Sequence, residues 1–253
     1  MRQRAAYPRF LAVAALAFSW LGLSAVSGQE FNEREVKSEA SALDPAFVWA
    51  FDFRFKDPRI IKVNIPGRGT RICWYMWYQV INRTAKPQQF IPDFELVTVD
   101  HPAVYPDEVL PIVEEEIRKR EDPTGYQEIK NSVTISKAPI PVSASADKGF
   151  PRAITGVAIW DASPEDPKKR GEGARDLSDT TKFSIFVRGL SNGFRVLDPV
   201  APGLPPINRY KTLQLNFKRT GDRFSTDSRD ITFVAPPEWI YRAISRKMDD
   251  KKK

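Results

Sequence analysis

Cysteine and histidine are almost absent from this chain of 253 residues, which contains one of each. Because Cys73 has no second cysteine to pair with, an intramolecular disulfide is excluded. Its position between Ile72 and Trp74 predicts a small buried apolar residue, since free cysteine is among the most buried residue types. Transition-metal sites usually use several histidine or cysteine ligands, so we expect no such site and no cofactor.

The common catalytic motifs are missing as well. The sequence contains no G-x-S-x-G motif, no P-loop and no GxGxxG motif. Asp100 is adjacent to His101 in sequence, but neighbouring residues of a strand face apart, which argues against a hydrolytic triad. No carboxylate pair for glycoside hydrolysis stands out, and we therefore expect that the protein is not an enzyme. Calcium binding stays open for the acidic residues Asp161, Glu165, Asp166, Asp176 and Asp179, whose usual role is a solvated loop.

No strongly basic patch is present, although the chain carries a net charge of +7. Its cationic groups are spread out and flanked by acidic residues, whereas a nucleic-acid surface concentrates them in one patch or stripe. The basic clusters 118–120 and 168–170 therefore predict solvated surface rather than a nucleic-acid partner.

The N-terminus has the layout of a secretory signal peptide, which we assign to residues 1–28. Arg2, Arg4 and Arg9 precede an apolar run, Phe10–Leu23, and small residues follow at the spacing that a signal peptidase accepts. The run has about 14 residues, fewer than the roughly 20 that span a bilayer, so an uncleaved anchor is the less favoured alternative. We expect export to the periplasm or the extracellular space, with no stable membrane span after cleavage.

The rest of the chain predicts one mainly β domain, residues 45–247, between a polar linker at 29–44 and a charged tail at 248–253. Short apolar segments recur with turn signals about every ten residues, which is typical of a β-sandwich. Residues 106–121 have helical spacing and predict one inserted amphipathic helix, and 162–181 lacks apolar periodicity, as in a mobile loop. Strands are also expected at NSVTISKAPIPVS and in a C-terminal hairpin. Residues 191–193 predict a tight hairpin turn, and EWIYRAI predicts a short docking helix.

The segment RICWYMWYQVINRT, residues 71–84, is apolar on both faces if it is a strand. A strand with one solvated face alternates apolar and polar residues, so both faces of this one need a cover. The inserted helix is the favoured cover for one face, because its own apolar side also needs a partner. The residues of that face are Cys73, Tyr75, Trp77 and Ile81, and those of the helix are Leu110, Val113 and Ile117.

The order YQVINRT, FELVTVD, GVAIWD and KFSIFVRGL resembles immunoglobulin-like modules of exported bacterial proteins, over roughly Ile60 to Leu190. The resemblance implies an immunoglobulin-like β-sandwich, with Trp74, Met76, Tyr78 and Val80 sharing the core-facing row of Asn82. Such modules are accessory or binding domains of uncharacterised function, so no catalytic residue is implied.

Exposed aromatic residues are the candidate binding groups, because aromatic side chains contribute strongly to interfaces. We take Tyr75, Trp77, Trp239 and Tyr241 as the candidates; the alternative is that the first two lie under the helix and the last two dock the C-terminal segment. The favoured function is a structural or protein-binding module acting on another envelope protein. The alternative is a carbohydrate-binding sandwich, which needs at least two exposed, coplanar aromatic rings.

Overall fold

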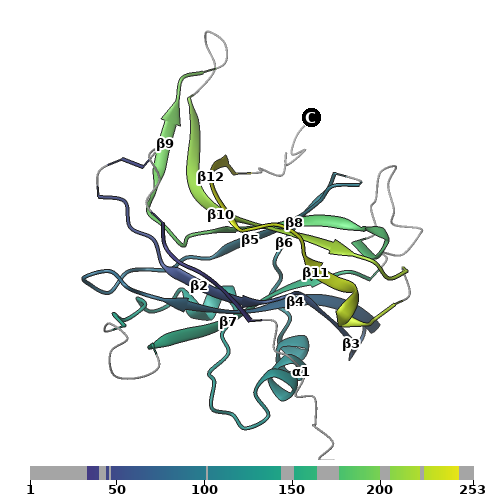
Figure 1. Ribbon diagram of the computed structural model, residues 1–253. Coiled ribbons are helices and arrows are strands. Elements are labelled where there is room, and N and C mark those ends of the chain that lie inside the picture. The colour runs from purple at the N-terminus through teal and green to yellow at the C-terminus, as the bar shows by residue number, and fades with distance from the viewer. Residues whose placement is uncertain are drawn as a thin grey trace, which may run out of the picture. The chain divides into compact units, whose positions relative to one another are not determined.

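The computed structural model describes residues 33–39, 44–45, 47–100, 102–143, 151–163, 177–199, 206–222 and 225–244. The chain divides into two units, Met1–Phe31 and Asn32–Lys253, and every described residue belongs to the second. Within that unit two antiparallel sheets pack together as a β-sandwich, which confirms the predicted mainly β class (Figure 1).

The first sheet is built around one long strand, β4. Its members are β1 (Glu33–Val36), β2 (Asp52–Lys56), β3 (Arg59–Ile65), β4 (Gly69–Ile81) and β7 (Ala153–Asp161). β2 and β3 pair with successive parts of the same edge of β4, and β7 pairs with the other edge. Asp57-Pro58 separates β2 from β3, as expected for a proline that cannot donate to the ladder. Gly67 in the turn between β3 and β4 and Gly69 at the start of β4 both have positive φ.

The second sheet is built in the same way around β10. Its members are β5 (Asp93–Thr98), β6 (Val104–Pro106), β8 (Lys182–Arg188), β9 (Phe194–Leu197), β10 (Ile207–Arg219), β11 (Ile231–Phe233) and β12 (Glu238–Ala243). β8 and β9 pair with one edge of β10, and β11 and β12 pair with the other. β5 continues the sheet from β8, and β6 follows β5.

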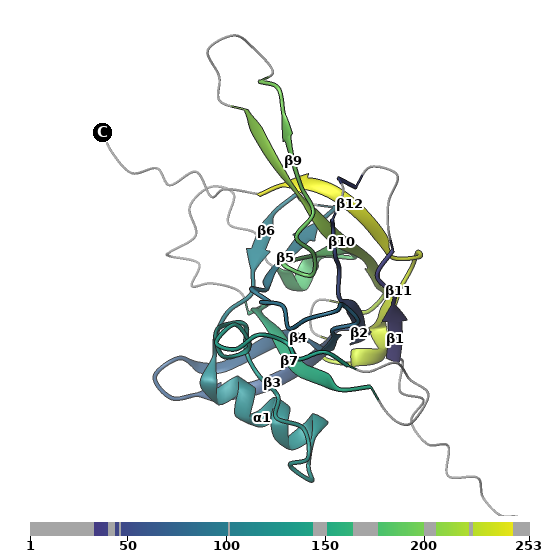
Figure 2. The same ribbon diagram turned by 90° about the vertical axis from the view of Figure 1, so that its left-hand side faces the viewer.

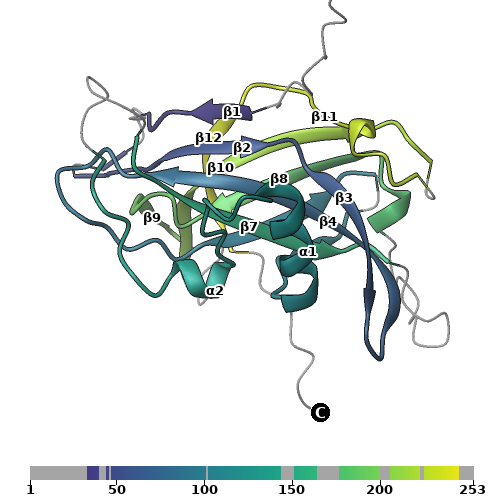
Figure 3. The ribbon, with the colours of Figure 1, turned by 90° about the horizontal axis from the view of Figure 1, so that it is seen from below.

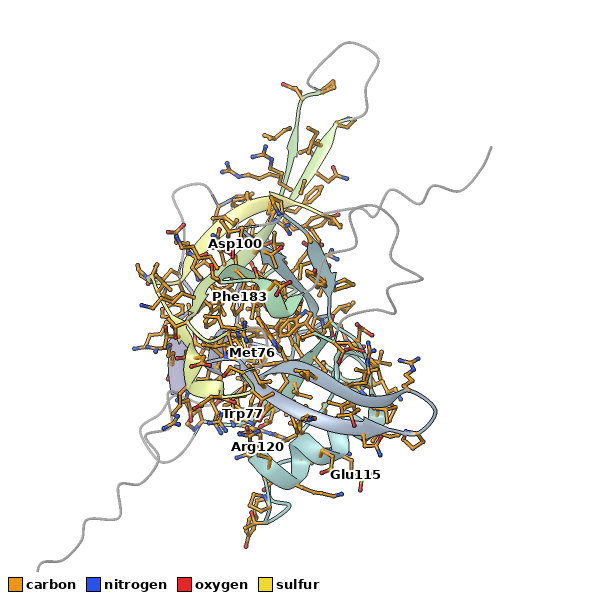
Figure 4. The ribbon with its side chains drawn as sticks, turned by 90° about the vertical axis from the view of Figure 1, so that its right-hand side faces the viewer. Met76, Trp77, Asp100, Glu115, Arg120 and Phe183 are labelled. Carbon is orange, nitrogen blue, oxygen red and sulfur yellow. The ribbon has the colours of Figure 1, made fainter. Side chains whose placement is uncertain are left out.

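Aromatic side chains fill the space between the two sheets. The ring of Tyr78 on β4 lies 5.5 Å from that of Phe53 on β2 and 4.8 Å from that of Phe94 on β5. Trp74 contacts Phe183 of β8 with ring centroids 5.2 Å apart. These rings join the two sheets, so the row of Trp74, Met76, Tyr78 and Val80 forms core, as predicted. Figure 4 shows Met76 of this row on the side of β4 where Phe183 lies.

The outer face of β4 is covered by the inserted helix, α1 (Pro111–Glu121), which Figure 3 shows in front of the first sheet. Proline occupies the first turn, and basic residues fill the last turn, where they suit the helix dipole. Val113 and Ile117 of α1 pack on Cys73, Tyr75 and Trp77 in a second apolar cluster. The helical cover is therefore confirmed for Cys73, Tyr75 and Trp77, whereas Ile81 is buried but lies outside this cluster. Trp77 and Met76 point to opposite sides of β4 (Figure 4).

A buried carboxylate fastens the end of α1 to this sheet. The side chain of Glu121 is 1% exposed and accepts hydrogen bonds from Tyr75 Oη at 2.7 Å, Lys56 Nζ at 3.0 Å and Arg59 Nη1 at 2.7 Å. Burial alone would raise the pKa of Glu121, but the hydrogen bond from Tyr75 and the two cations outweigh it and hold that pKa below its ordinary value.

Four local predictions were wrong. Ser132–Ile135 is not a strand but one helical turn, α2, because the Asn131 side chain caps it by accepting from the N–H groups of Val133 and Thr134. The segment EWIYRAI contains strand β12 rather than a helix, since it pairs with β10. Within the predicted polar linker 29–44, Glu33–Val36 forms β1 and pairs with β2. The turn at 191–193 does not join a hairpin, because β8 and β9 both pair with β10.

Candidate functional site

Tyr75 and Trp77, proposed from the sequence as binding residues, are 0% and 3% exposed. Tyr75 donates its hydroxyl to Glu121, and the indole Nε1 of Trp77 donates to Gln127 Oε1 at 3.2 Å. The ammonium of Lys56 lies 4.4 Å from the centroid of the Trp77 ring. Both side chains pack between α1 and the sheet. The prediction that Tyr75 and Trp77 form an exposed aromatic binding surface was therefore wrong.

Trp239 and Tyr241 lie on the inward row of β12 and are partly buried. Trp239 packs against the core between the sheets, and the hydroxyl of Tyr241 donates to Asp44 Oδ1 at 2.8 Å. Burial and that bond raise the pKa of Tyr241 to about 12. These two rings therefore pack within the fold instead of forming an exposed pair.

The remaining reactive groups named from the sequence give no reactive constellation among the described residues. Burial raises the pKa of the Cys73 thiol to about 12, so the thiol stays protonated. The carboxylate of Asp161 pairs with Arg71 at 2.6 Å, and the described part of the chain holds no group of three potential metal ligands. His101 lies outside the described residues, as do Glu165, Asp166 and Asp176.

Two cavities adjoin at the end of the sandwich where β2, β5 and β10 begin and β4 and β8 end. The larger, about 600 Å³, is lined by Trp49, Gln89, Ile91, Pro92, Asp93, Arg188, Gly189, Ser191, Asn192 and Tyr210. The smaller, about 350 Å³, is lined by Ser38, Glu39, Asp44, Val48, Trp49, Ala50, Arg83, Thr84 and Lys211. Trp49 lines both cavities. Volumes of this size are typical of small-molecule sites.

The position of Trp49 is set by the segment that follows β8. The backbone N–H of Trp49 donates to Asn192 Oδ1 at 2.7 Å, and its carbonyl oxygen accepts from Ser191 Oγ at 2.5 Å. The neighbouring Gly189 has a φ of +94°, and a Cβ there would lie 2.2 Å from the carbonyl oxygen of Ile91. Only glycine allows the two backbones to approach so closely in this conformation, which shapes the floor of the larger cavity.

Charged and aromatic side chains alternate along one wall of the larger cavity. Arg188 donates from Nε to Asp93 Oδ2 at 2.9 Å and forms a second hydrogen bond to the same carboxylate from Nη2. The guanidinium carbon of Arg188 lies 5.3 Å from the ring centroid of Tyr210. Among the described residues, the Tyr210 hydroxyl and the Trp49 indole N–H have no hydrogen-bond partner. These two groups are therefore available to a bound molecule.

The smaller cavity contains a buried ion pair. Lys211 is 1% exposed, and its ammonium lies 2.5 Å from Asp44 Oδ2 and donates to the carbonyl oxygen of Glu39 at 2.7 Å. A buried ammonium without a counter-charge would be strongly destabilising, so the segment that carries Asp44 is needed for β10 to place a lysine on its inward row.

No family model, curated protein or solved structure matches the chain. Among the described residues, no helix is long and apolar enough to cross a membrane. The candidate site therefore has to be interpreted from its own chemistry.

The sequence contained one missed signal for this site. Lys211 has the same parity along the strand as the apolar residues Leu213, Leu215 and Phe217, which form a buried row. The pattern therefore placed a charged side chain on a buried face, where it needs a partner of opposite charge. Trp49 could not be recognised in the same way, because the cavities combine residues that lie up to 173 positions apart, from Ser38 to Lys211.

Proposed function

We propose that the protein is a non-catalytic module of the cell envelope that acts by binding another protein. The location follows from the signal-like N-terminus, and the absence of catalytic motifs from the sequence supports a role in binding. The observation that carries the proposal is an arm formed by β9 and residues 207–210 of β10, in which residues 207 and 208 pair with β9 and residues 209 and 210 pair with both β9 and β12. It projects away from the two sheets in Figures 1 and 2.

The arm exposes apolar side chains that the fold does not use. Phe194 is 42% exposed, Val196 54% and Leu197 37%. The rings of Phe194 and Tyr210 lie 5.5 Å apart, so one face of the arm continues into the aromatic wall of the larger cavity. Clustered apolar side chains on a projecting element are typical of protein interaction sites.

The second face of the arm indicates the charge of the partner. Arg195 and Arg209 are paired in register on this face, which they share with Leu197 and Ile207. The guanidinium of Arg195 lies 4.7 Å from the ring centroid of Tyr241, whereas Arg209 is exposed. An exposed cation beside apolar side chains favours an apolar groove that carries a carboxylate at its rim. Complementary charge of this kind raises the association rate and selects the partner.

The test is site-specific photo-crosslinking in cells of the source organism. A photo-reactive amino acid at Val196 should yield one discrete protein adduct, and the same group at Val133, 55% exposed on α2, should not. Phe194→Asp should abolish the Val196 adduct while the protein remains folded. Equal adducts at both positions, or none at Val196, would refute the arm as the binding surface.

A further inference from the structure

We propose that the larger cavity is a binding site for a neutral, pyranose-containing oligosaccharide, with Trp49 and Tyr210 as its aromatic platforms and Asp93 and Arg188 as its polar anchors. The site shares Tyr210 with the base of the arm but includes none of the exposed residues of β9, and the inference does not depend on the protein partner proposed above.

The aromatic residues suit the faces of sugar rings. A pyranose presents axial C–H groups on a face, and these contact an aromatic ring, while its hydroxyls project from the ring edge. Trp49 and Tyr210 both line this cavity, and the indole N–H and the phenol O–H have no hydrogen-bond partner among the described residues. The guanidinium of Arg188 lies over the Tyr210 ring, so this ring offers its other face and its hydroxyl. Such side chains combine apolar contact area with one hydrogen-bonding group, and a ligand that is apolar on one face and polar at its edge matches both.

The polar groups suit hydroxyls rather than a charged ligand. Asp93 Oδ1 and Arg188 Nη1 form no hydrogen bond to the described residues, whereas the other polar atoms of the pair bind each other. The pair therefore offers one strong acceptor and one strong donor side by side, as vicinal hydroxyls require. Because the two charges compensate, an anionic ligand such as a nucleotide would meet an unfavourable carboxylate.

The smaller cavity extends the same chemistry around Trp49. Its charged lining residues are Glu39, Asp44, Arg83 and Lys211, so formal charges again balance. A volume of about 600 Å³ in the larger cavity alone lies within the range that holds a drug-sized ligand. The site is thus sized for an oligosaccharide segment rather than for a single small ion.

The site is also preformed. Asn192 and Ser191 fix the backbone of Trp49 through three hydrogen bonds, two of them described above and one from the Asn192 N–H to the Trp49 carbonyl oxygen at 3.4 Å. Fixed platforms reduce the conformational entropy lost on binding, which matters for sugars because each hydroxyl exchanges water for a protein group at little net gain.

The experiment is calorimetric titration of the purified protein with cellotetraose, chitotetraose and maltotetraose, each to about 10 mM, the range where weak binding is still measurable. We expect at least one of the three to bind saturably. Trp49→Ala and Tyr210→Ala should each weaken that binding roughly tenfold or more, since a buried aromatic contact contributes about 1.5 kcal/mol.

Matched variants distinguish the loss of a sugar contact from a loss of protein stability. Tyr126 is 92% exposed and lies outside both cavities, so Tyr126→Ala should bind like the wild type. Tyr210→Phe keeps the platform and should lose several-fold only, and Arg188→Lys should weaken binding without changing the melting temperature by more than a few degrees. The proposal is overturned if none of the three sugars binds, if Trp49→Ala binds unchanged, or if binding falls equally in Tyr126→Ala.

Discussion

Shortening Ile117 to alanine should open the cover over β4 while leaving the core between the sheets intact. Ile117 is 0% exposed and packs on the cluster that contains Cys73, so its truncation should cost about 2–5 kcal/mol in transfer and cavity terms. A central value of about 3 kcal/mol corresponds to a roughly hundredfold rise in the population in which α1 is detached.

Native-state labelling of Cys73 with a thiol reagent measures that population. Cys73 is 0% exposed and its pKa is raised to about 12, so reaction requires detachment of α1. The labelling rate of Ile117→Ala should rise about hundredfold, in proportion to the opening equilibrium. Ile112→Ala is the control, because Ile112 lies on the same helix but is 39% exposed and should change stability by less than about 0.5 kcal/mol. Rapid labelling of the wild-type protein, or an unchanged rate in Ile117→Ala, would refute the helical cover.

Two further predictions concern single side chains. Because the folded-state pKa of Glu121 lies below its ordinary 4.5, Glu121 stabilises the protein fully above the unfolded-state pKa, and this contribution is lost as the pH falls through the lowered value. Glu121→Gln should therefore lower the free energy of unfolding at neutral pH by about 3–5 kcal/mol. Measured by denaturant unfolding, the stability of the variant should also fall less steeply than that of the wild type as the pH is lowered; parallel plots of stability against pH would contradict this. Gly189→Ala should lower the melting temperature far more than Gly67→Ala, since both have positive φ but only the first would place a Cβ 2.2 Å from Ile91. Equal shifts would refute the close approach.

Periodicity decided which parts of the fold could be predicted. The two apolar rows of β4 and the helical spacing of α1 are regular over many residues, so the sandwich and its helical cover were predictable. Short segments were not. Val133 and Ile135 alternate like a strand, but Asn131 and Thr134 form a capping box that makes one helical turn.

Long-range pairing decided the remainder. In β12 the alternation of Trp239 and Tyr241 was present in the sequence, yet only β10 determines that the segment extends as a strand. The cavities were unpredictable for the same reason. Trp49 becomes a binding group only because Asn192, 143 residues later, holds its backbone beside Tyr210.

The bond network of Asp44 sets a limit on how far the chain can be shortened. Asp44 joins Lys211 and Tyr241, which follow it by 167 and 197 positions, so the segment before β2 closes the structure around its last strands. A protease that removed this segment would leave a buried ammonium without a counter-charge and a tyrosine hydroxyl without its acceptor. A chain shortened to Glu33, where β1 begins, would keep β1 and both bonds of Asp44.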